Sequence, residues 1–130
     1  MVAYSFHKQF VAPIIAGTKR QTIRRERKRH ARLDEVMRLY TGMRTQHCRA
    51  IGEAICQLVC PITLDFGAER IRYPFGLGMV TLFTPDLDGF AQLEGFGDWA
   101  TMRTFWAEQH DAVEVFSGVL IRWSDFRVAG

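Results

Sequence analysis

A short stretch near the N-terminus, "GTKRQTIR" (residues 17–24), places a lysine and a hydroxyl side chain at close spacing. Lys19 and Thr22 are three positions apart, so a tight loop or a helix end would bring their side chains together. A lysine that is surrounded by other cations or partly desolvated has a lowered pKa and can accept a proton near neutral pH. Lys19 could then act as a base, with Thr22 as the nucleophile or as the group that orients a water.

This chemistry also needs an acid, and the best candidate lies far along the chain. Glu94, in "AQLEGFGDW", is flanked by Leu93, Gly95 and Phe96. A carboxylate among apolar neighbours suits a general acid/base or a substrate anchor. The residues alone also allow simpler roles, with Lys19 as a phosphate contact, Thr22 as an ordinary strand residue and Glu94 as a capping or solvated side chain.

The positive charge of the chain is concentrated in residues 19–32. This segment holds one acid, Glu26, and eight basic residues, which are Lys19, Arg20, Arg24, Arg25, Arg27, Lys28, Arg29 and Arg32. The chain as a whole carries a net charge of only +3, so the remainder is net acidic. Such a one-sided field attracts phosphate groups. We expect Arg25, Arg27, Lys28 and Arg29 to contact an RNA backbone, and the alternative is a solvated basic loop without a ligand.

Several other classes of function find no support in the sequence. There is no phosphate-binding glycine loop, no nucleophile elbow and no histidine pair of the metalloprotease type. Cys48, Cys56 and Cys60 do not have zinc-site spacing, and their odd number argues against a disulfide framework. We therefore expect no metal and no cofactor. No apolar run is long enough to cross a membrane and no secretion signal is evident, so we expect a cytoplasmic protein without a membrane partner.

The elements that would position these residues follow from periodicity. Alternating β-prone segments predict strands at 2–6, 35–41, 70–73, 78–83 and 113–126, an extended piece at 21–24, and one bent strand or two short strands at 48–66. Helices are expected at 8–17 and 98–110, the second with Asp98 as its N-cap and an aromatic inner face. The length fits a single domain, 1–130, of mixed α+β class on a curled sheet or barrel.

Three segments resemble the ASCH domains, a branch of the PUA-like superfamily. "IIAGTKRQTIR" (14–24) resembles their G-x-K-x-x-T-I-R loop, and "LYTGMRTQHCRAIGEA" (39–54) is similar to the strand that follows it in many members. "LEGFGDWATMRTFW" (93–106) resembles their third block, and the likeness extends from residue 4 to about residue 123. It implies a small PUA-like β-barrel with flanking helices and an association with RNA.

The resemblance also implies an activity and the residues that carry it. One ASCH branch hydrolyses acetylcytidine to cytidine and acetate, and its catalytic lysine, threonine and glutamate correspond to Lys19, Thr22 and Glu94. Arg24 matches the arginine of the same motif and would contact an oxyanion or a phosphate. The basic continuation "RERKRHARLDE" (25–35) departs from that branch, which leaves the substrate open between a modified nucleoside and RNA.

A second group of polar residues lies at the end of the expected strand 35–41 and directly after it. Tyr40, Thr41, Arg44 and Thr45 could line the same cleft, with Tyr40 stacking on a base, or could form an ordinary polar turn. The function expected from the sequence is an amidohydrolase acting on an acylated nucleobase or nucleoside. The alternatives are an RNA-binding PUA-like module without catalysis and a metal-independent ribonuclease.

Overall fold

The computed structural model describes residues 2–130, and within them it forms seven strands and three α-helices. The strands are β1 (Val2–Phe6), β2 (Gln21–Arg24), β3 (Val36–Thr41), β4 (Arg49–Asp65), β5 (Arg70–Phe75), β6 (Gly78–Leu82) and β7 (Val115–Val128). The helices are α1 (Val11–Ala16), which follows the 3-10 turn η1 (Lys8–Phe10), α2 (Asp86–Leu93) and α3 (Trp99–Gln109). The expected mixed α+β class is confirmed. None of the helices in this part of the chain is long and apolar enough to cross a membrane.

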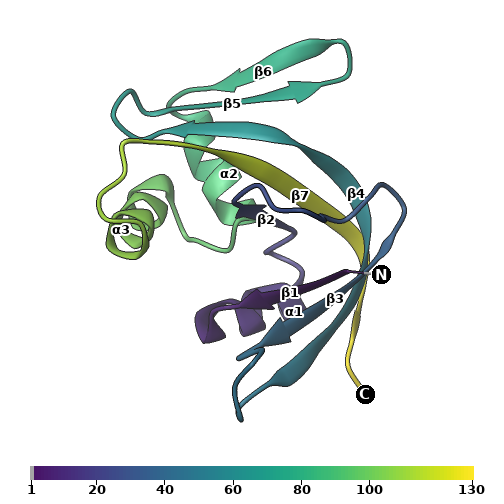
Figure 1. Cartoon of the computed structure of the whole chain (residues 1–130). Coiled ribbons are helices and arrows are strands. Elements are labelled where there is room, and N and C mark those ends of the chain that lie inside the picture. The colour runs from purple at the N-terminus through teal and green to yellow at the C-terminus, as the bar shows by residue number, and fades with distance from the viewer. Residues whose placement is uncertain (1) are drawn as a thin grey trace.

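The long antiparallel pair of β4 and β7 organises the sheet (Figure 1). On the edge away from β7, β4 pairs with β3 near its beginning and with β5 near its end. On the edge away from β4, β7 pairs with β2. β1 joins β3 in parallel, and β6 extends the sheet beyond β5 as a hairpin. Strand β4 is one bent strand, with register shifts at Glu53/Ile55 and Cys56/Leu58 that increase its local twist.

The sheet is curled but open, whereas the resemblance to ASCH domains implied a β-barrel. Closure would require β1 to pair with β2, and no such pairing exists among the described strands. Side chains cross this seam instead of backbone hydrogen bonds. Arg24 Nη2 donates to the Ser5 carbonyl at 2.7 Å, and Arg27 Nη2 donates to the Ala3 carbonyl at 3.4 Å. The curl thus brings β1 and β2 close without joining them into one ladder.

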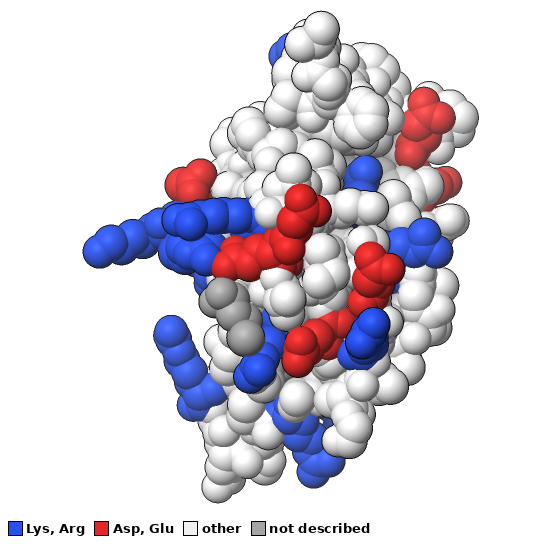
Figure 2. All heavy atoms as spheres, turned by 90° about the vertical axis from the view of Figure 1, so that its right-hand side faces the viewer, with Lys and Arg blue, Asp and Glu red and all other residues white. Residues whose placement is uncertain are grey.

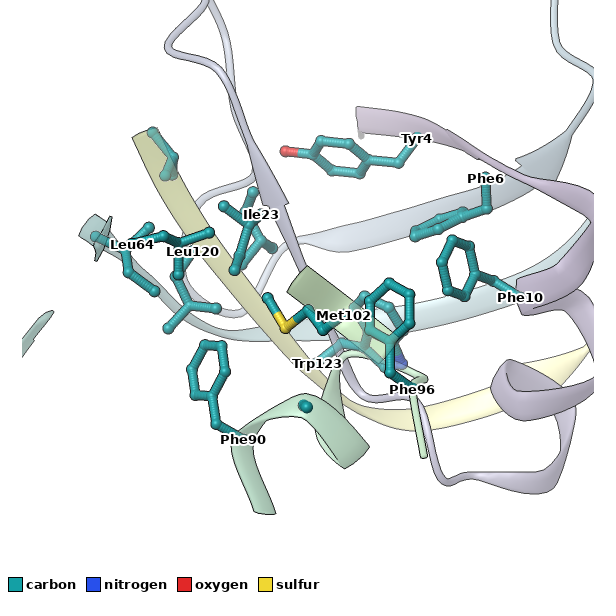
Figure 3. Close-up of a cluster of buried hydrophobic side chains, with 14 of the residues drawn as sticks. Tyr4, Phe6, Phe10, Ile23, Leu64, Phe90, Phe96, Met102, Leu120 and Trp123 are labelled. Carbon is teal, nitrogen blue, oxygen red and sulfur yellow. The ribbon is translucent and has the colours of Figure 1, made fainter. Parts of the chain in front are cut away.

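The hydrophobic core lies between the curled sheet and the helices. Figure 3 shows Tyr4 and Phe6 of β1, Ile23 of β2, Phe90 of α2 and Met102 of α3 directed into one cluster. Each is buried, and full burial of a large apolar side chain contributes about 1.5–3 kcal/mol. The core therefore fixes the positions of β1 and β2 against the helices.

Helix α3 begins at the predicted N-cap and buries the predicted aromatic face. The Asp98 carboxylate accepts a hydrogen bond from the Thr101 N–H at 2.8 Å, which caps the first turn. Trp99, Met102 and Trp106 are buried along one face, and Phe66 stacks on Trp99 with ring centroids 5.2 Å apart. The aromatic stripe therefore packs in the core.

Helix α2 was not predicted. Its eight residues include Gly89, which weakens a helical pattern, and it is preceded by Pro85. Leu87, Phe90 and Ala91 are nevertheless buried at helical spacing, so tertiary packing stabilises the helix. Because of α2, Glu94 lies at the end of one helix as well as before another.

Candidate functional site

The loop between α1 and β2 carries Lys19 into the interior. Gly17 ends α1 in the left-handed conformation, with a φ of 81°, which glycine adopts without steric cost. The N–H groups of Thr18 and Lys19 then both donate to the Pro13 carbonyl, at 3.0 and 3.1 Å. This turn leaves the whole of Lys19 only 2% exposed, so its amine is held away from bulk water.

Glu94 meets Lys19 from the end of α2. Lys19 Nζ lies 3.7 Å from Glu94 Oε2 and donates to the Glu94 carbonyl at 2.5 Å. The same amine donates to the Gln21 carbonyl at 2.8 Å. Two backbone acceptors and one carboxylate thus surround the lysine, and Glu94 supplies two of these three groups.

Two buried polar atoms at this position lack a partner. Glu94 Oε1 and Gln21 Nε2 make no hydrogen bond with the described residues, although the Gln21 amide is near enough to favour the charged carboxylate. Gln21 Oε1 is engaged, since Arg122 donates to it through Nε and Nη2 at 3.1 and 2.9 Å. A buried polar atom without a partner costs about 1–3 kcal/mol. The Glu94 carboxylate is therefore held in the interior without a full set of hydrogen bonds.

Burial drives both members of the pair toward their neutral forms. It lowers the pKa of Lys19 to about 8, against the opposing effect of the Glu94 charge. Burial likewise raises the pKa of Glu94, against the opposing charge of Lys19. Burial thus moves the two pKa values toward each other, which reduces the cost of passing a proton between the two groups. The pair can thus present either a base or an acid.

Strand β2 positions Thr22 and Arg24 beside this pair. Alternate residues of a strand share one side, and the pairing of β2 with β7 fixes which side that is. Arg24 Nε donates to Thr22 Oγ1 at 2.9 Å, and the guanidinium lies 4.8 Å from the centroid of the Phe6 ring. Burial lowers the pKa of Arg24 from its ordinary value. A fixed cation therefore contacts the threonine hydroxyl.

These four side chains line one cavity of about 450 Å³. Its polar inner part is formed by Lys19, Thr22, Arg24 and Glu94. Its walls are mainly aromatic, with Phe6, Phe10, Ile23, Phe96, Phe105, Trp106 and Phe116. Figure 3 shows Phe6, Phe10 and Phe96 close together, and the Phe10 and Phe96 rings meet edge to face with centroids 5.4 Å apart. The lining residues nearest the surface are Ser5, His7, Arg25, Glu26, Arg27, Gln109 and His110.

The basic segment is only partly associated with this cavity. Arg25 and Arg27 line its opening, whereas Lys28 is exposed and does not line it. Arg29 forms a two-pronged ion pair with Glu35. In the space-filling view of Figure 2, the largest group of Lys and Arg side chains projects from one edge of the molecule, with acidic side chains on the adjoining surface. The segment therefore combines cations at the cavity with others that face solvent or an acid.

The second group of expected site residues lies elsewhere. Thr41 and Thr45 line a separate hollow of about 1300 Å³, which adjoins the first through Ser5, Phe6 and His7. Tyr40 lines a third hollow, near Arg38 and Arg127. Arg44 is exposed in the turn after β3, with a φ of 68°. The structure does not bring these four residues to the cavity that holds Lys19.

Several residues in the cavity or beside it, such as Gln21, whose carbonyl accepts from Lys19, escaped the sequence analysis. Gln21 is fully buried, a position that strand alternation with the inward-facing Ile23 would have indicated. His110 stacks on Trp106, with ring centroids 4.4 Å apart, and only the fold brings it beside the basic segment. Phe10 and Phe96 belong to the core and to the cavity at once, which no local pattern reveals.

Within residues 2–130, no group of three or more His, Cys, Asp or Glu side chains is arranged to hold a metal ion. A scan of the chain against protein-family models gave no match, and neither did searches among curated proteins and solved structures. The function must therefore be argued from the geometry of the cavity.

Proposed function

We propose that this chain is a metal-independent amidohydrolase that removes the acyl group from an acylated nucleobase, of which acetylcytidine is the model substrate. The observation that carries the proposal is the buried pair of Lys19 and Glu94, which lies in the same cavity as Thr22 and Arg24. The pair offers a base and an acid, and the threonine offers a nucleophile. Arg24 adds a cation where negative charge would develop.

Lys19 is well placed to act as the base in its neutral form. Both N–H groups of a neutral amine would be satisfied by the carbonyls of Gln21 and Glu94. The nitrogen lone pair then remains free to accept a proton. The proton that Lys19 gives up resides on Glu94, whose raised pKa favours the acid form.

The proposed reaction has two stages that return the pair to its starting state. Lys19 takes the hydroxyl proton of Thr22 while Oγ1 attacks the acyl carbonyl carbon, and Arg24 stabilises the resulting oxyanion. The carbon–nitrogen bond then breaks, and the leaving amine takes the proton of Glu94. In the second stage Glu94 accepts a proton from a water that attacks the threonine ester. Thr22 leaves and recovers its proton from Lys19, so that amide and water have become amine and carboxylic acid.

The shape of the cavity favours a planar, apolar-faced substrate of nucleoside size. Its volume lies within the range of small-molecule sites, about 300–1,000 Å³. Aromatic side chains such as those that form the walls can stack on any nucleobase. The resemblance to ASCH domains supports the same roles for Lys19, Thr22 and Glu94. In line with it, we propose that the open sheet is a PUA-like barrel whose last seam, between β1 and β2, is crossed by side chains.

The direct test is turnover of acetylcytidine by the purified chain, with cytidine release followed by chromatography. We expect release by the unaltered protein and by Thr22→Ser, and none by Thr22→Ala. The exposed variant Arg103→Ala, which removes only a surface ion pair with Glu69, serves as the control. Mass spectrometry of a single turnover should find the acetyl group on Thr22. Full activity of Thr22→Ala would exclude the threonine as nucleophile, and no turnover by the unaltered chain would contradict the proposal.

A second candidate, RNA binding without catalysis, is favoured by the exposed cations of the basic segment. Replacement of Arg25, Arg27, Lys28 and Arg29 together by alanine should then weaken binding of a single-stranded RNA. The logarithm of the affinity should also fall as the logarithm of the salt concentration rises, with a slope of close to one unit for each phosphate contacted. Affinity that does not respond to salt would exclude this candidate.

A further inference from the structure

The opening of the cavity concentrates positive charge. Of its surface-lying residues, Arg25 and Arg27 are cationic, His7 and His110 are titratable, and Glu26 is the one acid. The Glu26 carboxylate is turned toward the backbone, since its Oε1 accepts from the Arg27 N–H at 3.2 Å. Cations gathered around a concave opening focus their field on an anion that enters it.

Arg25 contributes an exposed cation to this opening. Within residues 2–130 its guanidinium makes no hydrogen bond and no ion pair with the protein. Arg27, in contrast, donates through Nε to the Arg29 carbonyl at 2.8 Å and lies 4.6 Å from the centroid of the Tyr4 ring. One arginine is therefore held in place by its neighbours, and the other has all its donors available. Guanidinium donors match phosphate oxygens in geometry as well as in charge.

His110 lies at the same opening and feels the charge of Arg25. Its ring stacks on Trp106 and is tilted against Phe116, with a centroid distance of 5.8 Å to the latter. Burial lowers the pKa of His110, and the Arg25 charge lowers it further. Two groups that repel each other when both are charged are thus held together beside an opening. An anion between them would remove this repulsion.

We propose that Arg25, Arg27 and His110 form a subsite for a phosphate monoester, so that the cavity takes a nucleoside 5′-phosphate in preference to a free nucleoside. The proposal rests on the proposed function for the identity of the base. In a nucleotide the phosphate lies at the opposite end from the exocyclic amine of the base. In the cavity, Arg25 and Arg27 are likewise exposed, whereas the Lys19–Glu94 pair is buried. A nucleotide that binds with its base inside the cavity would therefore place its exocyclic amine toward the Lys19–Glu94 pair and its phosphate at the cationic opening.

The subsite is tested by binding, without any reaction. Calorimetry with cytidine 5′-monophosphate and with cytidine should show at least about tenfold tighter binding of the phosphate, as expected for charge-assisted hydrogen bonds. Arg25→Ala should remove most of this preference. Arg32→Ala is the matched control, because Arg32 belongs to the same basic segment, is exposed and does not line the cavity. Equal affinity for the two ligands would overturn the proposal, as would an equal loss in both variants.

The imidazole of His110 gives an independent readout. Its NMR titration should move to higher pH when cytidine 5′-monophosphate or inorganic phosphate is added, and should not move with cytidine. The other charged groups at the opening are Arg25, Arg27 and Glu26, and the second histidine, His7, is distinguished from His110 by its own resonance. An unchanged His110 titration with every ligand would exclude its part in the subsite.

These results are separable from the fate of the proposed function. Preference for the nucleotide together with no hydrolysis of acetylcytidine would support the subsite and contradict the amidohydrolase. Hydrolysis of acetylcytidine and of its 5′-phosphate with equal kcat/KM would support the enzyme and overturn the subsite. An oligonucleotide without a terminal phosphate that binds as tightly as the mononucleotide would overturn the preference for a monoester and favour a strand of RNA.

Discussion

Lys19 and Glu94 are 75 positions apart in the sequence, yet the lysine amine contacts both the carboxylate and the backbone carbonyl of the glutamate. A further hydrogen bond, from the Arg20 N–H to the Leu93 carbonyl at 2.9 Å, ties the same two segments together. These backbone contacts therefore hold the two residues in place whatever the charge of their side chains. Both side chains are at most 6% exposed, so neither charge can be left alone without a large desolvation cost.

The first prediction concerns the stability of this pair. Lys19→Met should destabilise the fold by about 3–5 kcal/mol at neutral pH, because it leaves a buried carboxylate without its partner. The double variant Lys19→Met/Glu94→Gln should lose less than the sum of the single losses, with a coupling of about 1–3 kcal/mol. Urea denaturation of the unaltered protein, Lys19→Met, Glu94→Gln and the double variant measures this coupling. The exposed pair Arg103/Glu69 is the control, with an expected coupling below about 1 kcal/mol.

The pH dependence of the stability of Lys19→Met tests whether the unpaired Glu94 carboxyl group causes the loss. The folded-state pKa of Glu94 lies above its ordinary value because of burial. The folded protein then holds its proton over a pH range in which the unfolded chain has lost it, so stability falls as pH rises through that range. The variant should be closest to the unaltered protein in acid. Additive losses, or a deficit that does not change with pH, would show that the two side chains do not form a coupled buried pair.

Part of this site was accessible from the sequence. Strand alternation placed β1, β2 and β3 within a residue or two, and helical spacing identified the buried face of α3 and its Asp98 cap. Short-range spacing also made Lys19 and Thr22 a candidate pair. These features depend on local periodicity, which each segment carries by itself.

Other parts depend on contacts that no local pattern contains. Helix α2 is short and contains Gly89, and only packing of Phe90 and Leu87 stabilises it. Barrel closure depends on whether two edges meet, and here Arg24 occupies the seam between them. His110 lies in the connection from α3 to β7, and β7 pairs with β2, the strand that leads into the basic segment. Such long-range relationships are set by the core as a whole, so the sequence left them undetermined.

The second prediction is a bell-shaped dependence of kcat/KM on pH. The reaction needs one proton shared between Lys19 and Glu94. Above about pH 8, the pKa of Lys19, the pair loses that proton, and kcat/KM should fall by about tenfold per pH unit. On the acid side, kcat/KM should fall as Glu94 binds a proton while Lys19 still holds its own, at a pH above the usual range of a glutamate. Initial rates with acetylcytidine between pH 5 and 10 measure both limbs.

The variant Glu94→Gln assigns the limbs of that profile. The Glu94 charge raises the pKa of Lys19, so its removal should move the lysine titration below 8. Any residual activity should then increase with pH and level off, without an alkaline decline. A variant that keeps the bell of the unaltered protein would show that other groups produce it.

The third prediction concerns Gly95, which lies against the lysine stem. Its φ is 100°, and a Cβ at this position would lie 2.9 Å from Lys19 Cδ and 3.0 Å from Phe10 Cδ1. Gly95→Ala should therefore displace Lys19 and strain the backbone, with a loss of about 1–3 kcal/mol in stability and a fall in kcat. Gly89→Ala is the control in the preceding helix, where a Cβ meets nothing within 4 Å. It should be neutral or stabilising by up to about 1 kcal/mol. Equal activity of the two variants would mean that the lysine position is not critical.

The last prediction separates the charge of Arg24 from its shape. Its Nε and Nη2 donate to Thr22 and to the Ser5 carbonyl at once, in a plane that packs on Phe6. Lysine keeps the charge but cannot reproduce the forked geometry of both bonds, so Arg24→Lys should lower kcat/KM by about 100-fold, at the lower end of the loss of an oxyanion donor. Arg103→Lys, at an exposed ion pair, should be unaffected. Guanidinium ion added to Arg24→Ala should restore part of kcat, because the cavity left by the side chain can hold the free cation. If Arg24→Lys keeps full activity and guanidinium has no effect on Arg24→Ala, a single positive charge is all that the reaction requires at this position, and the forked geometry serves only to hold β1 against β2.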